Sequence, residues 1–110
     1  MANVFKLKTK NEILHASAED LYTVPSSKTA IVLGLILANK GTTAVKATVT
    51  LVNNDGNNVT ILHQVTLPKN TTLEFFAGQK LVLNTSDIMR VQSDIASSLD
   101  VALSIMEQDV

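Results

Sequence analysis

The sequence predicts an all-β fold: one domain over residues 1–110, built as a jelly-roll-like β-sandwich of eight to nine short antiparallel strands. Three observations support this fold class. Strand-like segments recur about every ten residues along the chain. Turn-forming Asn, Asp, Gly and Pro lie between these segments. No stretch shows the apolar period of a helix of normal length, so a mixed fold is not expected.

The first expected strand, Val4–Lys8, alternates between apolar and basic residues. Successive side chains of a strand point to opposite faces, so Lys6, Lys8 and Lys10 share one face. Lysines at such positions are typical of an edge strand that must not pair with other chains. A basic strip that binds an acidic partner is the alternative.

The next segment, Glu12–Ala18, is expected to be strand and loop. Ser17–Asp20 matches a helix capping box, but Pro25 leaves room for no more than one helical turn. Asp20–Val24 is therefore expected to be a short strand that ends at this proline.

The strongest strand signal is Thr29–Asn39, because both of its faces are apolar. One face carries Ile31, Leu33, Leu35 and Leu37. The other face carries Val32, Gly34, Ile36 and Ala38. Such a strand lies either at the centre of a two-sided core or against another subunit. Gly34 indicates a bulge or a close approach of another backbone.

The later strands are expected at Ala44–Val52, Asn58–Leu67, Thr72–Phe76, Lys80–Leu83, Ile88–Ser93 and Leu99–Glu107. In the first of these the inward residues are Val45, Ala47, Val49 and Leu51. In the second, one side carries Val59, Ile61, His63, Val65 and Leu67. In the last, the inward residues are Leu99, Val101, Leu103 and Ile105.

The loop NNDGNN, residues 53–58, joins two of these strands and is rich in possible calcium ligands. Only Asp55 is charged, however, and no downstream Glu completes a calcium-binding pattern. Asn, Asp and Gly also suit the backbone angles of a hairpin turn, so a plain turn is expected.

No residue pattern points to catalysis, and no cofactor or metal is expected. Cysteine is absent, so thiolate chemistry and Cys-ligated zinc are excluded. No serine lies in a nucleophile elbow that would give His15 or His63 a partner. His63 alternates with core residues, which favours a core or interface position. The acids lie mostly in turns, and the four glycines are scattered, so neither a glycosidase pair nor a phosphate loop is indicated.

Composition also argues against two kinds of partner. The net charge is -1 and the chain has a single arginine and few aromatic residues, so no nucleic-acid partner is expected. The longest apolar run, Ala30–Ala38, is about half of what a membrane helix needs, so no membrane partner is expected. The N-terminal segment lacks the long apolar region of a signal peptide.

Several segments resemble a family of small virion structural proteins of tailed bacteriophages, notably myoviruses of cyanobacteria: MANVFKLKTK, LYTVPSSKTAIVLGLILAN, VTLVNNDGNNVTIL, PKNTTLEFFAGQKLVL and ASSLDVALSIME. The resemblance runs essentially from end to end. It implies a particle component, either a capsid decoration (cement) protein or a small protein of the neck, tail or baseplate. It offers no catalytic residues to transfer.

The expected function is therefore that of a non-enzymatic capsid decoration protein, located in the virion and assembled in the host cytoplasm. Its expected partner is the major capsid protein, and a homo-oligomer is expected, with a trimer favoured because capsid lattices present threefold sites. Contact candidates are Val32, Ile36, Ala38, Phe75, Phe76, Lys6 and Lys8. Ordinary packing within the domain is the alternative for each.

Two other functions stay open. A neck, tail or baseplate adaptor would bind tail or neck proteins instead, and its copy number would follow the symmetry of the tail. A carbohydrate-binding β-sandwich of a fibre is the other alternative. Lectin sites usually present aromatic platforms, and a chain with no Trp and one Tyr is poorly equipped for one.

Overall fold

The computed structural model describes residues 3–13, 15, 17–75 and 80–109. Within this part every regular element is a strand, so the predicted all-β class is confirmed. The strands are β1 (Asn3–Lys10), β2 (Glu19–Thr23), β3 (Lys28–Asn39), β4 (Val45–Val52), β5 (Asn58–Leu67), β6 (Thr72–Phe75), β7 (Leu81–Leu83), β8 (Ile88–Ser93) and β9 (Leu99–Asp109). No helix that could cross a membrane is found among these described residues.

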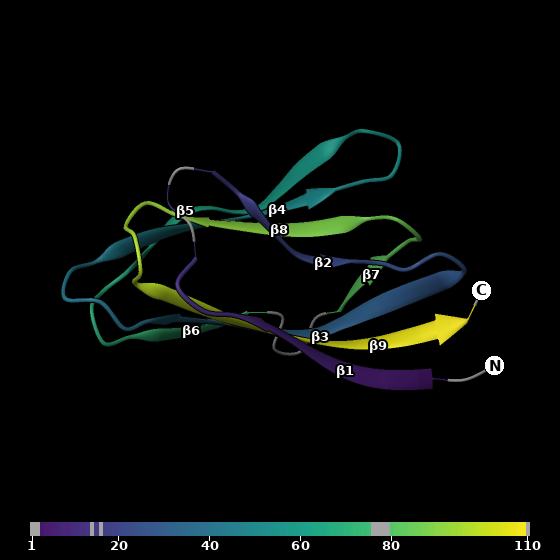
Figure 1. Ribbon diagram of the computed structural model, residues 1–110, viewed down its shortest axis with the longest axis horizontal. Helices are drawn as coiled ribbons and strands as arrows, with labels where there is room; N and C mark the ends of the chain where they lie inside the picture. Colours follow the sequence, from purple (N-terminus) through teal and green to yellow (C-terminus); the bar gives the residue numbers. More distant parts are fainter. Residues whose placement is uncertain (1–2, 14, 16, 76–79, 110) are drawn as a thin grey trace.

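The strands form two packed antiparallel sheets, the lower and upper layers of Figure 1. The first sheet has the order β1-β9-β3-β6, with β7 also paired to β3, and the second has the order β2-β8-β4-β5. β6 pairs with residues 35–38 of β3 and β7 with residues 30–32, so the two continue one sheet edge. Taken as one strand, they complete a nested series of pairs: β1 with β9, β2 with β8, β3 with β6 and β7, and β4 with β5. This winding is that of a jelly roll, as predicted.

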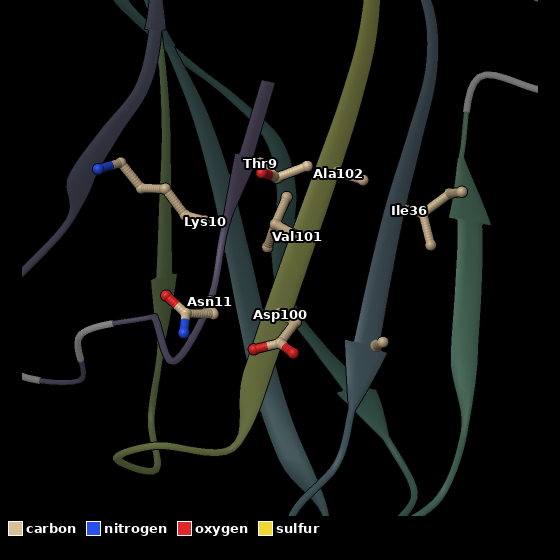
Figure 2. Close-up of a pocket in the computed structure, with 8 residues that line it drawn as sticks. Thr9, Lys10, Asn11, Ile36, Asp100, Val101 and Ala102 are labelled. Carbon is tan, nitrogen blue, oxygen red and sulfur yellow. The ribbon is translucent and has the colours of Figure 1, made fainter. Parts of the chain in front are cut away.

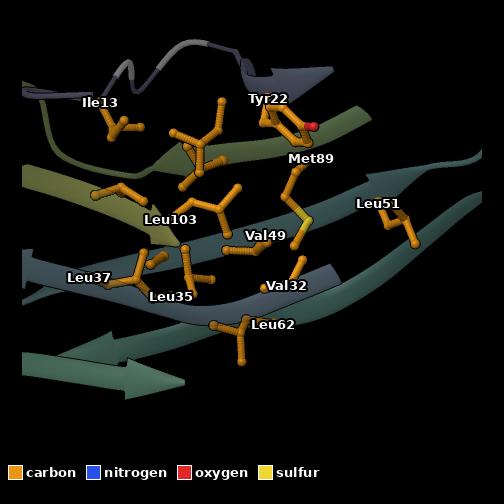
Figure 3. Close-up of a cluster of buried hydrophobic side chains, with 14 of the residues drawn as sticks. Ile13, Tyr22, Val32, Leu35, Leu37, Val49, Leu51, Leu62, Met89 and Leu103 are labelled. Carbon is orange, nitrogen blue, oxygen red and sulfur yellow. The ribbon is translucent and has the colours of Figure 1, made fainter. Parts of the chain in front are cut away.

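The hydrophobic core lies between the two sheets (Figure 3). The alternation predicted for β4 and β9 is confirmed, because their inward residues are buried: Val45, Ala47, Val49, Leu51, Leu99, Val101, Leu103 and Ile105. Ile13 is also fully buried and anchors the segment between β1 and β2, where its backbone N–H donates to the carbonyl of Leu99 at 2.8 Å. The strand expected within Glu12–Ala18 is not present among the described residues of that segment.

A bulge in β3 overturns part of the predicted alternation. Val32 lies opposite Ile105 and Gly34 opposite Ser104, which leaves Leu33 as an extra residue. Because a bulge exchanges the faces of the residues beyond it, Val32 points into the core and is fully buried there. The prediction that Val32 shares a face with Ile36 is therefore wrong, and Val32 is not available for contacts with another subunit. The bulge expected at Gly34 is confirmed.

A second irregularity exposes His63. In β5, Leu62 lies opposite Val49 while Val65 lies opposite Ala47, so β5 carries one more residue here than β4. The extra residue turns the Leu62 side chain into the core and leaves His63 exposed. The prediction that His63 alternates with core residues is wrong for this reason.

Gly34 lies at the bulge of β3 and Gly41 follows the end of this strand. The two glycines differ in the space around them. A Cβ at Gly41 would lie 2.5 Å from Oγ and 2.8 Å from Cβ of Ser98, whereas a Cβ at Gly34 would meet nothing within 4 Å. Gly41→Ala is therefore expected to lower the free energy of unfolding by about 1–2 kcal/mol, because the clash displaces the turn after β3. The matched control, Gly34→Ala, is expected to be close to neutral. Urea denaturation of both variants checks this, and equal losses would contradict it.

Candidate protein–protein interface

The two outward faces of the sandwich differ in chemistry. The second sheet turns mostly polar side chains outward: Lys46, Thr48, Thr50, Thr66, Arg90 and Gln92. The outward side of the first sheet, here called the apolar face, carries Phe5, Leu7, Ile31, Ile36, Ala38, Val82, Ala102 and Met106. Large exposed apolar surfaces of this kind mark sites of protein contact, so the apolar face is the candidate functional site.

Cross-strand register arranges the apolar face in rows. One row crosses four strands with large side chains, Phe5, Met106, Ile31 and Val82, and is here called the ridge. Phe5 is 71% exposed and Val82 60% exposed. The next row is small at its centre, where Ser104 and Gly34 follow Leu7, itself 63% exposed. The third row contains Thr9, Ala102, Ile36 and Glu74.

An open depression of about 380 Å³ lies at the small-residue end of the apolar face. Three neighbouring strands contribute to it: Thr9 from β1, Asp100 and Ala102 from β9, and Ile36 from β3 (Figure 2). The depression forms because Ala38 and Ala102 are small, whereas the same two strands carry Ile31 and Met106 in the ridge. The apolar face therefore has both a protrusion and a hollow.

The structure separates the apolar residues that were predicted as contacts. Ile36 and Ala38 lie on the apolar face, and Ile36 is 42% exposed. Phe75 lies opposite Leu35, which faces inward, and it packs against the hydrophobic core. Phe76 lies outside the described residues. Of this group, Ile36 and Ala38 stay candidates for contacts.

The basic strip of β1 faces the other way. β1 is an edge strand, as predicted, and Lys8 lies opposite Leu103 on the inward side of the sheet. Lys6 contacts Glu107 at 2.9 Å, and Lys10 contacts Glu19 at 3.6 Å. Two of the three lysines thus have acidic partners within the chain, which favours the interpretation as a protected edge.

Lys6, itself exposed, contacts a buried Glu107–Tyr22 pair, and the sequence pattern did not indicate this network. Glu107 continues the inward series of β9, is 2% exposed, and accepts a hydrogen bond from the Tyr22 hydroxyl at 2.6 Å. Burial alone would raise the pKa of Glu107, but hydrogen bonds from Tyr22 and Lys6, with the charges of Lys6 and Lys28, lower it overall. Burial, the hydrogen bond and the charge of Glu107 together raise the pKa of Tyr22. The network ties β1 and both sheets together.

Six residues of the apolar face were not predicted as contacts: Phe5, Leu7, Ile31, Val82, Ala102 and Met106. For Phe5 and Leu7 the signal was present, because they alternate with the lysines of VFKLK. Because the lysines of β1 face inward, Phe5 and Leu7, which alternate with them, must face outward. Ile31 and Val82 required knowledge of the β3 bulge and of the pairing with β7.

A polar depression of about 360 Å³ on the second sheet brings His15 near Ser93 and Asp94. The Ser93 hydroxyl donates to the carbonyl of Ile95 at 2.8 Å and accepts from the Ile95 N–H at 3.1 Å. The Asp94 carboxylate accepts from the Lys46 N–H at 2.7 Å. Both groups therefore hold the turn between β8 and β9, and the Ser93 proton is donated to the Ile95 carbonyl.

The NNDGNN loop is a turn, as predicted. The Gly56 N–H donates to the Asn53 carbonyl at 2.9 Å, and Gly56 has a positive φ of 93°. The Asp55 carboxylate accepts from the Asn57 N–H at 3.0 Å. Buried Asp87 accepts from the Asn54 N–H at 2.9 Å and so fixes the loop to the β7–β8 connection. Among the described residues, no group of three His, Cys, Asp or Glu side chains could hold a metal.

Comparisons with known proteins show the fold. No protein-family profile and no curated protein matches the sequence. A chain from Bacillus endospore appendages, described as a novel family of disulfide-linked pili, is similar with a TM-score of 0.60 and 13% identity over 98% of this chain and 88% of that one. A chain in the acid-stable capsid of the Helicobacter pylori bacteriophage KHP30 is similar with a TM-score of 0.59 and 12% identity over 99% and 98%. A chain of the T13 viral particle of IBDV is similar with a TM-score of 0.52 and 10% identity, and this chain spans 30% of its length.

Proposed function

We propose that this chain is a non-enzymatic structural protein of a bacteriophage virion, most specifically a capsid decoration protein that stabilises the shell through protein–protein contacts. The observation that carries the proposal is the apolar face. A sandwich of this size already buries a core between its sheets, so a second apolar surface is not needed for the fold of one copy. Surface that is costly in water and unused within the domain is typical of a subunit that assembles.

The exposed ridge has a definite energetic consequence. Phe5, Met106 and Val82 are large and stand in one continuous row. Burying a side chain of this kind is worth about 1.5–3 kcal/mol, so the ridge alone supplies several kcal/mol toward association before the entropic costs. A decoration protein uses this free energy as a clamp, because contacts across neighbouring shell subunits must be broken before the shell opens.

The fold supports the same function class. Two solved chains that share the fold over nearly the whole of this chain belong to a phage capsid and to a pilus. Capsids and pili are both assemblies of repeated protein subunits. This chain contains no cysteine, so a disulfide link like that named for the pili is not open to it. The proposed assembly therefore rests on non-covalent contacts.

The proposed partner is the major capsid protein, and the proposed location is the virion, assembled in the host cytoplasm. The proposed contact residues are Ile36 and Ala38, which the sequence predicted, together with the residues of the ridge. Homo-oligomerisation belongs to the proposal: threefold sites of a shell would suit a trimer, and self-pairing of the apolar face would give another order.

Quantitative mass spectrometry of purified particles of the phage that encodes the chain tests this function. The expected result is hundreds of copies per particle, comparable with the number of shell subunits. Six to a few dozen copies would instead favour a neck, tail or baseplate adaptor, and absence from the particle would overturn the virion function.

A further inference from the structure

We infer that the apolar face pairs with the apolar face of a second copy of this chain, in a twofold, face-to-face arrangement in which the strands of the two copies run antiparallel. The inference rests on the proposed function, in which the apolar face is covered by protein; it names a second copy, in place of the major capsid protein, as the protein that covers this face. It follows from the shape of the face, its charges and its size.

Over β1 and β9 the shape of the apolar face is complementary to itself. The ridge lies on one side of the Ser104 row and the depression on the other. A twofold axis in the plane of the face, across the strands at this row, places each ridge over the depression of the other copy. Over β1 and β9, Phe5 then opposes the partner's Thr9 and Met106 the partner's Ala102. Over β3 and the β6–β7 edge, Ile31 opposes the partner's Ile36 and Val82 the partner's Glu74. Leu7 meets the same residue of the partner at the axis, as an isologous interface requires.

A twofold axis along the strands gives a poorer fit. It would set ridge against ridge and hold the two sheets apart, so that both depressions stay empty. Sheets pack about 10 Å apart with interdigitating side chains, which favours large residues over small ones. The antiparallel arrangement is therefore the one that fills space.

The charges favour the same arrangement. The outward acidic residues of the first sheet, Glu74 and Asp100, both lie toward the depression end. An axis along the strands would bring these like charges together. The antiparallel arrangement sends the acidic residues of the two copies to opposite ends of the pair, where each Glu74 lies at the sheet edge opposite the partner's Val82. Asp100 also contacts Lys40 at 3.2 Å within the chain, so its charge is partly matched before pairing.

The size of the face suits a reversible pair. Four strands about 4.8 Å apart and roughly eight residues long give about 500 Å² of flat area per copy, or about 1,000 Å² for the pair. That area lies at the lower end of specific protein–protein interfaces. A concentration-dependent dimer is therefore expected.

Sedimentation equilibrium of the purified chain up to about 1 mM tests the pairing, because even weak association is populated there. The expected result is a reversible monomer–dimer equilibrium. Leu7→Arg is expected to weaken the dimer at least about 30-fold, since two arginines then meet at the axis. The control Thr60→Arg places the same charge on exposed β5 of the second sheet and is expected to leave the dimer unchanged. Circular dichroism checks that both variants fold.

A pair of substitutions tests the antiparallel register. Met106→Lys and Ala102→Glu are each expected to weaken the dimer about tenfold, and the double variant is expected to recover most of the loss, because each lysine then faces a glutamate of the partner. An axis along the strands predicts the opposite, since like charges would meet in the double variant.

Each outcome decides the inference. A chain that stays monomeric, or that forms a trimer, would overturn twofold pairing. A dimer that survives Leu7→Arg would overturn the assignment to the apolar face, and a double variant without recovery would overturn the antiparallel arrangement. None of these results touches the virion function, which fails only if the chain is missing from purified particles.

Discussion

Asn39→Ala is expected to lower the free energy of unfolding by about 3 kcal/mol, because it removes the hydrogen bonds of a buried side chain to four backbone groups. Asn39 is 3% exposed at the end of β3. Its Nδ2 group donates to the carbonyl oxygens of Thr43 and Leu67 at 3.0 Å and of Pro68 at 3.2 Å. Its Oδ1 accepts from the Gly41 N–H at 2.9 Å. One side chain thus joins the β3–β4 turn to the end of β5.

Urea denaturation at low protein concentration measures this loss. The matched control is Asn58→Ala, which removes an exposed asparagine at the start of β5. The control is expected to change the free energy of unfolding by less than about 0.5 kcal/mol. Comparable losses in the two variants would show that Asn39 does not hold the turn.

Glu107→Ala is expected to lower the free energy of unfolding by about 1–3 kcal/mol, because it removes the acceptor of a buried hydrogen bond. The Tyr22 hydroxyl loses its acceptor between the sheets, and Lys6 loses the contact that ties β1 to β9. The same denaturation experiment measures this loss. A loss below about 1 kcal/mol would contradict the importance of the network.

Glu107→Gln tests the pH dependence of this network. The pKa of Glu107 is lowered in the folded chain from its ordinary value of 4.5. A carboxylate of this kind stabilises the fold above the unfolded pKa and loses that contribution as the pH falls through the folded pKa. The free energy of unfolding of the wild type should therefore exceed that of the variant most at neutral pH. This difference should shrink below about pH 4.5.

The control for the pH series is Glu12→Gln. Glu12 contacts Lys40 at 3.6 Å with half of its side chain exposed, so it forms a surface ion pair of little value. Unfolding free energies of the three chains between neutral and acidic pH make the comparison. If the difference between wild type and Glu107→Gln stays constant through this range, the carboxylate is not the acid-sensitive group.

Most of the fold was predictable because alternation and turn residues are local signals. The bounds predicted for β5 and β8 are those of the structure, and the inward series of β9 was correct from Leu99 to Ile105. What failed was the continuation of alternation through bulges. A bulge depends on which residue of the partner strand lies opposite, and that pairing is not written in the segment itself.

The candidate site was predictable in kind and only partly in place. An apolar surplus in Thr29–Asn39 indicated either a two-sided core or a face against another subunit, and Ile36 and Ala38 lie on an outward face. The ridge depends on register across four strands, so Met106 and Val82 could not be joined to Phe5 before the sheet order was known. Burial of Glu107 was equally hidden, since a charged residue at the end of an apolar strand is usually solvated.

The central claim, that the apolar face is covered by protein in the assembled state, is tested most directly by hydroxyl-radical footprinting. The oxidation rates of Phe5, Leu7 and Met106 are compared between the dilute chain and the purified particle, with Val59 of the second sheet, 44% exposed, as reference. Protection of the three apolar-face residues with little change at Val59 is predicted. Unchanged oxidation at Phe5, Leu7 and Met106 in the particle would contradict the account.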